Sequence, residues 1–254
     1  MGQALERFVR GLYDESHSVG SRVAKRFGVR AFPTLLVLDA DGGELDEVNG
    51  RTPEEFVEEL QRIARGDDTM ASLRARLKSN PRDVEAAADL AGRLHMRHPK
   101  EAEELATQGL AQASPDQTEE RAELMLIRAS LLAEREDLSA ALDLLEQILA
   151  ELPQTKAAGS VGYVLWNYAH EGEPSRMLHL LERAIEVAPE EVRGDLLGMR
   201  ILLHERKLQA LIRTQAEKAH DDGEWLNRIA WDCYVRGWLL TDALAWAHRA
   251  VELT

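Results

Sequence analysis

Apolar residues recur every three to four positions through most of the chain after residue 66. From Gly66-Asp67-Asp68 onward the composition shifts to Ala, Leu, Glu and Arg, in periodic stretches of about a dozen residues. This period is typical of amphipathic helices that each bury one face. Residues 67–254 are therefore predicted to form an all-helical domain.

The helical stretches repeat in pairs with a period of about 34 residues. Ala129, Ala141 and Pro153 lie twelve positions apart, with Leu145 and Ile148 between the last two. Leu181, Ala184 and Pro189 fall at places equivalent to Leu145, Ile148 and Pro153 in the next block. About five pairs are expected, at residues 82–115, 120–153, 156–189, 191–221 and 224–254. The fourth block lacks Pro and the usual small residues. These spacings resemble those of the tetratricopeptide (TPR) family, which implies a solenoid of stacked helix pairs.

Small residues mark the positions where such helices would approach closely. They are Ala129, Ala141, Ala184, Ala230 and Ala250. Gly159 and Gly162 are spaced to allow tight packing of the first helix in their block. Since one helix pair cannot bury its apolar stripe alone, stacking against neighbouring pairs is expected to supply the core.

Residues 1–66 show a different pattern. The apolar run Leu35–Leu38 follows Pro33-Thr34, and its length fits a strand covered on both sides. Residues 43–50 are predicted to form a second strand, antiparallel to the first through an Asp-Gly turn. A helix is expected over residues 18–26.

Two further elements complete this region. Residues 8–14 are predicted to form a strand, with a helix over residues 3–13 as the alternative. Thr52, Pro53 and Glu55 indicate the capped start of a last helix. Its apolar face comprises Phe56, Val57, Leu60 and Ile63, and Gly66 ends it.

The order strand, helix, strand, strand, helix, with Phe27-Gly28-Val29 and Pro33-Thr34 at its turns, resembles the second half of a thioredoxin fold. The implied fold class is α+β: a partial thioredoxin-like βαββα unit (1–66) followed by an all-α TPR-like solenoid (67–254). The resemblance implies a cis peptide bond before Pro33. It also implies that Phe32, Pro33 and Thr34 form a loop that docks extended peptides, and the alternative is a rigid turn.

The single cysteine, Cys233, excludes an internal disulfide, a CxxC pair and a cysteine-based zinc cluster. The reactive cysteines of the thioredoxin family would lie before residue 1, so disulfide exchange by these residues is excluded. The N-terminal region is either a truncated domain, which we favour, or a half-domain retained as a scaffold. We expect no enzymatic activity, catalytic residue, metal or cofactor.

The charge balance narrows the class of partner. Lys and Arg number 31 against 45 Asp and Glu, for a net charge of −14. Such a surface repels polyanions, so neither nucleic acid nor an anionic membrane is expected as a partner. The apolar runs are too short for a membrane helix, and the start has no apolar signal core, which predicts a cytoplasmic chain.

Isolated polar residues give weaker signals. His95 and His98 have helical spacing but no third ligand, so a solvated helix end is favoured over a metal site. His204-Glu205 and His220-Asp221-Asp222 are interpreted as helix-end residues. Cys233 is expected to be buried and unreactive.

The first helix of each TPR pair lines a groove that binds peptides in that family. On this register the groove candidates are Trp166, His170, Asn227, Trp231 and Tyr234. Core packing of the tryptophans is the alternative interpretation.

The domain order resembles bacterial thioredoxin–TPR proteins, co-chaperones among them. It implies a non-catalytic adaptor that binds protein or peptide clients, and a structural scaffold is a weaker option. The alternative is part of a thiol–disulfide oxidoreductase with its CxxC upstream. Apolar residues near the C-terminal end, including Trp238 and Trp246, also predict self-association through residues 225–254.

Overall fold

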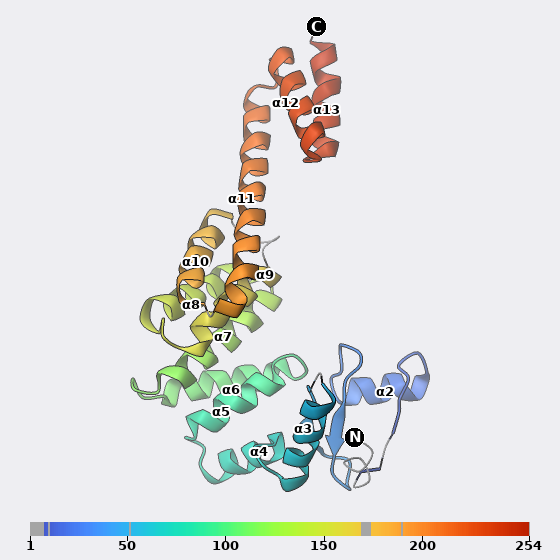
Figure 1. The fold of residues 1–254 in the computed structure, drawn as a ribbon, viewed down its shortest axis with the longest axis vertical. Coiled ribbons are helices and arrows are strands. Elements are labelled where there is room, and N and C mark those ends of the chain that lie inside the picture. The colour runs from blue at the N-terminus through green and yellow to red at the C-terminus, as the bar shows by residue number, and fades with distance from the viewer. Residues whose placement is uncertain (1–7, 10, 51, 169–173, 189, 254) are drawn as a thin grey trace. The chain divides into compact units, whose positions relative to one another are not determined.

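The computed structural model describes residues 8–9, 11–50, 52–168, 174–188 and 190–253 (Figure 1). The chain is mostly helical, with a small antiparallel hairpin near its N-terminus. Its contacts divide it into two compact units, Met1–Ala158 and Gly159–Thr254. The predicted domain boundary after residue 66 lies inside the first unit and remains a prediction.

The first unit begins with the hairpin and its flanking helices. In chain order these elements are α2 (Ser18–Arg26), β1 (Leu36–Leu38), β2 (Glu44–Glu47) and α3 (Pro53–Arg65). The predicted helix over residues 18–26 and the antiparallel pairing of the two strands are confirmed. The peptide bond between Phe32 and Pro33 is cis, as the resemblance implied.

Local sequence explains how α3 begins and ends. The Thr52 hydroxyl accepts a hydrogen bond from the Glu55 backbone N–H, and the Glu55 carboxylate accepts one from the Thr52 N–H. Gly66 ends the helix with a left-handed backbone that a side chain would disfavour. Leu60 and Ile63 then pack on Val37 and Val48 of the hairpin region.

Two predictions for the N-terminal region are wrong. Residues 8–9 and 11–14 contain no strand, and the alternative helix is not formed at these residues either. Val9 and Leu12, which a strand would have to bury, are fully exposed. Strand β1 is also not covered on both sides, because Val37 is buried while Leu38, on the opposite face, is 40% exposed. The buried face of the hairpin packs against Leu60 and Ile63 of α3.

The rest of the first unit is a run of helices. They are α4 (Met70–Ser79), α5 (Val84–Leu94), α6 (Pro99–Gln112), α7 (Thr118–Glu134) and α8 (Leu138–Glu151). Each contacts the next along the chain, and α5 also contacts α7. Their main core includes Leu73, Leu90, Leu94, Leu124 and Leu131. The first two predicted blocks, 82–115 and 120–153, thus each form two contacting helices.

The second unit contains the remaining helices. They are α9 (Lys156–Asn167), which begins just before the unit boundary, α10 (Pro174–Val187), α11 (Glu190–Lys218), α12 (Gly223–Arg236) and α13 (Leu240–Glu252). The predicted helix pair at residues 191–221 is wrong, since α11 is one continuous helix of 29 residues. Residues 199–218 contain no Gly or Pro that would interrupt it.

Candidate functional site

Three of the predicted groove residues form an exposed stripe on α12. Asn227, Trp231 and Tyr234 are spaced by four and three residues and so share one side of the helix. Trp231 is 65% exposed and Tyr234 66% exposed, and their ring centroids lie 5.8 Å apart. The alternative that Trp231 packs in the core is therefore wrong. We call Asn227, Trp231 and Tyr234 the α12 stripe.

The other side of α12 explains why the α12 stripe faces outward. Leu226, Ala230 and Cys233 are buried, Leu226 against Ala216 and Ala250, and the other two against Ala243. The Asp222 carboxylate caps the helix by accepting a hydrogen bond from the Trp225 backbone N–H at 2.9 Å. The stripe is thus fixed by a buried face and a capped end. Such exposed aromatic residues are typical of protein contact surfaces.

The predicted groove across all five residues remains a prediction. His170 lies outside the described residues, as does the side chain of Trp166, whose backbone belongs to α9. Gly162 of α9 lies against Leu196 of α11, so closely that a Cβ on Gly162 would clash with the Leu196 side chain. Leu226 of α12 packs instead against Ala216, near the other end of α11. These contacts are twenty residues apart, which is about 30 Å along a helix. Among the described side chains, those of Asn227, Trp231 and Tyr234 lie together as the α12 stripe.

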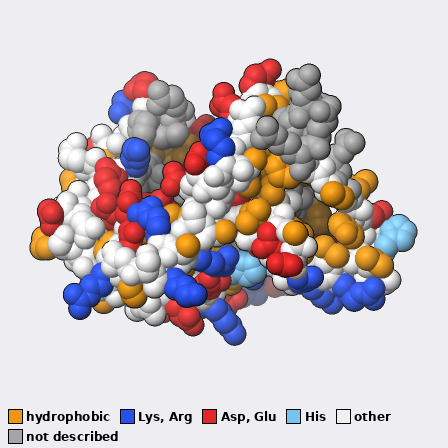
Figure 2. Space-filling view, turned by 90° about the horizontal axis from the view of Figure 1, so that it is seen from below, with side chains coloured by type: hydrophobic (Ala, Val, Ile, Leu, Met, Phe, Trp, Pro, Cys, Tyr) orange, Lys and Arg blue, Asp and Glu red, His pale blue; other side chains and the backbone are white. Residues whose placement is uncertain are grey.

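The cis-Pro loop lies beside a second exposed apolar surface. Phe32 is 60% exposed, and the Thr34 hydroxyl donates a hydrogen bond to the Ala31 carbonyl at 2.6 Å. Other exposed apolar residues of this region are Val9, Leu12, Val19, Leu35 and Leu38. Figure 2 shows hydrophobic side chains gathered on the right of the view, near α2 and the hairpin. This surface suits contact with another polypeptide.

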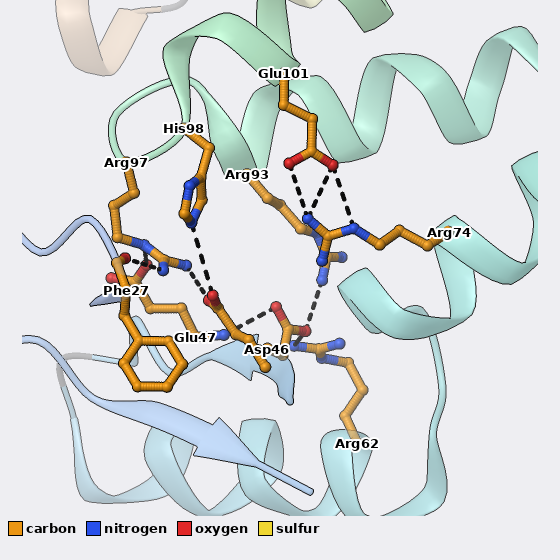
Figure 3. A network of polar contacts seen from close by, with 10 residues as sticks. Phe27, Asp46, Glu47, Arg62, Arg74, Arg93, Arg97, His98 and Glu101 are labelled. Atoms are coloured by element: carbon orange, nitrogen blue, oxygen red, sulfur yellow. Dashed lines mark hydrogen bonds and ion pairs between the residues drawn. The ribbon is translucent and has the colours of Figure 1, made fainter. Parts of the chain in front are cut away.

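A network of ion pairs joins the hairpin to the helices of the first unit (Figure 3). The side chain of Asp46 is only 3% exposed. Its Oδ2 accepts hydrogen bonds from Arg62 of α3 at 2.8 Å and from Arg93 of α5 at 2.7 Å. One buried carboxylate in β2 thus connects two helices.

Arg97 is the second centre of this network, in the turn between α5 and α6. Its guanidinium donates to Glu44, to Glu47 Oε2 at 2.9 Å and to the Phe27 carbonyl at 3.1 Å. Its side chain is 5% exposed. Burial alone would lower the pKa of Arg97, but the two carboxylates more than compensate and raise it.

These contacts correct the prediction of a solvated helix end at residues 95–98. Arg97 is buried, and His98 Nε2 lies 3.9 Å from Glu44 Oε2. The sequence held a signal for this, because Arg93 and Arg97 are four residues apart and opposite charges cluster at residues 44–47. Since every member is already paired within the fold, the network is a means of attaching the hairpin and not a ligand site.

Two carboxylates lie at the surface between α5 and α7. Burial raises the pKa of Glu123, and Asp89, Glu120 and Glu119 raise it further. Burial likewise raises the pKa of Asp89. A Cβ on Gly92 would stand 3.3 Å from Glu123 Oε1, so this carboxylate lies close against α5. Such carboxylates cost stability when they are ionised.

We expect Glu123→Gln to stabilise the first unit at neutral pH. The pKa of Glu123 is higher in the folded than in the unfolded chain. The folded chain therefore loses stability as the pH rises from the unfolded-state pKa to the folded-state pKa. The gain from Gln should disappear below about pH 4, where Glu is protonated in both states. Urea titrations followed by circular dichroism at several pH values would measure it. Glu104→Gln, at an exposed position of α6, is the control, and an equal gain at every pH would contradict the prediction.

Other chemistry finds no support in the described residues. No group of three or more His, Cys, Asp or Glu side chains there is placed to hold a metal ion, and no described helix is long and apolar enough to cross a membrane. Cys233 is buried as predicted, and burial raises the pKa of its thiol. His204 and Glu205 lie in the middle of α11, so their interpretation as helix-end residues is wrong, whereas His220 and Asp221 do follow a helix end.

A comparison with models of known protein families finds no match, and a comparison with curated proteins finds none. Any assignment of function to this chain therefore depends on its own sequence and structure.

Proposed function

We propose that this chain is a non-enzymatic adaptor that binds segments of other proteins, with the α12 stripe as its principal contact surface. The exposed pair Trp231 and Tyr234 carries this proposal. Aromatic side chains supply much of the binding energy in protein interfaces, and they lose little conformational entropy when they are fixed. Asn227 beside them offers both a donor and an acceptor to a peptide main chain.

The architecture supports the same function. Helix pairs of TPR-like spacing are suited to present side chains on helix faces to a bound peptide. The cis-Pro loop and hairpin resemble the peptide-docking part of a thioredoxin-like domain, and Phe32 lies exposed there. We infer that this second surface helps to hold unfolded or extended clients. The combination is similar to that of bacterial thioredoxin–TPR co-chaperones.

The expected clients are extended segments with apolar or aromatic residues. The net charge of −14 disfavours nucleic acid and acidic segments and favours clients that carry basic residues. No reaction is required of the protein in this role, because the client leaves chemically unchanged. Suppression of aggregation of an unfolded test protein is the simplest expected activity.

We expect Trp231→Ala to weaken binding of an unstructured, aromatic-rich peptide by roughly 30-fold, the loss typical of an interface hot spot. Fluorescence anisotropy of the labelled peptide would measure affinity, and light scattering of an aggregating test protein would measure holding activity. Since Trp231 is mostly exposed, the substitution should leave folding nearly unchanged.

Leu244→Ala provides a matched control, because Leu244 is a comparably exposed apolar residue on the neighbouring helix α13. It should bind like the wild type. If Trp231→Ala binds the peptide and suppresses aggregation as well as the wild type, the α12 stripe is not the client surface. A further variant, Phe32→Ala, would show whether the cis-Pro loop contributes independently.

A further inference from the structure

A second apolar stripe runs along α11 and is distinct from the α12 stripe. Its members are Leu197, Ile201, His204, Leu208 and Leu211, spaced alternately by four and three residues. The four apolar side chains are between 36% and 60% exposed. This alternation is the heptad spacing by which two helices pack along a common seam. We call these five residues the α11 seam.

The seam is not the face that α11 uses to join its neighbours in the chain. Leu196, Met199 and Leu203 are buried on a different side of the helix, where its N-terminal part contacts α10. At its other end, Ala216 packs against Leu226 and Ala250. Helix α11 is therefore apolar on two sides, of which one is packed and one is exposed.

The middle of α11 also needs a source of stability. From residue 204 to residue 211, none of its side chains is buried, whereas Ile212 beyond them packs against Ala230, Cys233 and Ala243. Most helical stability in proteins comes from packing of an apolar face. A partner on the α11 seam would supply that packing over the stretch where it is missing.

We propose that the α11 seam pairs two copies of this chain as a parallel, in-register helix dimer. In heptad terms Ile201 and Leu208 occupy a positions, while Leu197, His204 and Leu211 occupy d positions. In a parallel pair each residue then meets its own counterpart. Ile201 at a, with Leu197 and Leu211 at d, is the combination that two-stranded pairs favour, whereas Leu208 at a and His204 at d depart from it.

The charges that flank the seam select the parallel orientation. Arg200 and Glu205 lie five residues apart, at g and e positions, so Arg200 of each copy faces Glu205 of the other. In an antiparallel pair like charges meet instead. In one antiparallel register Arg200 faces Lys207 of the second copy, and in the other Lys207 and Glu205 each face their own counterparts. Charge complementarity therefore favours the parallel dimer.

Sedimentation velocity of the full chain across micromolar concentrations tests the proposal. Wild type should dimerise, and Ile201→Asp or Leu208→Asp should weaken the dimer by roughly 100-fold, since each places two charges in the seam. Leu202→Asp is the matched control, because Leu202 is 49% exposed on the same helix but off the seam. It should dimerise like the wild type. His204→Leu should strengthen the dimer.

Orientation is tested separately. Arg200→Glu should weaken a parallel dimer, and adding Glu205→Arg should restore it, whereas Arg200→Glu would strengthen or spare an antiparallel one. In a Cys233→Ala background, Leu208→Cys should form a disulfide between copies on oxidation. A monomeric wild type overturns the proposal. So does a dimer that tolerates Ile201→Asp but is lost with Leu240→Asp, which would assign self-association to residues 225–254.

Discussion

Arg97→Ala is expected to lower the free energy of unfolding of the first unit by about 3–5 kcal/mol, the usual loss when one partner of a buried ion pair is removed. The guanidinium contacts Glu44, Glu47 and the Phe27 carbonyl, and no other cation among the described residues contacts all three. Alanine would leave two poorly solvated carboxylates side by side. Arg97→Lys should recover part of the loss, since one ammonium cannot match the planar guanidinium.

The location of the tryptophans allows the two units to be followed separately. All five lie in the second unit, so tryptophan fluorescence reports its unfolding, while far-ultraviolet circular dichroism reports both units. In urea, Arg97→Ala should shift the circular dichroism transition and leave the fluorescence midpoint unchanged. Arg135→Ala, which removes an exposed partner of Glu103, should have little effect. Equal stability of the Arg97→Ala variant and the wild type would show that the network does not attach the hairpin.

Helix ends and turns could be predicted from the sequence, because they are determined by residues close together in the chain. The Thr52–Glu55 capping box, Gly66 and the Asp-Gly turn all act within a few residues, and each appears as expected. The small residues Ala129, Ala141 and Ala184 are buried for the same reason, since helical period alone places them on an inner face. Predictions of this kind depend on spacing and require no knowledge of distant residues.

The predictions that are wrong depend on residues far away in the chain, or on a partner that is not found among the described residues. Residues 8–14 have an apolar pattern that suits a strand, but no second strand pairs with them among the described residues. Local pattern predicts Arg97 at a solvated helix end, because its carboxylate partners lie about fifty residues earlier in the chain. The block at 191–221 was expected to turn back at its middle, although nothing there breaks a helix. In this block the helical propensity of the residues outweighs the repeat spacing.

The α12 stripe shows how a site can be half predicted. Helical register correctly placed Asn227, Trp231 and Tyr234 on one face of α12. It could not reveal that α11 would extend as one helix and separate α12 from α9. A groove across several pairs depends on the path of the whole solenoid, whereas a stripe on one helix depends only on its own period.

Gly162→Ala is expected to destabilise the second unit by about 1–3 kcal/mol, although alanine favours helix by about 1 kcal/mol over glycine. The new Cβ would stand 2.2 Å from Leu196 Cδ2, and Leu196 is only 2% exposed, so it has no space into which to move. Gly198→Ala in α11 is the same change where no atom lies within 4 Å, and it should stabilise by about 0.5–1 kcal/mol. Urea titrations followed by tryptophan fluorescence would compare the two variants. Opposite signs would establish that α9 packs closely on α11 through Gly162, and two equal gains would refute that contact.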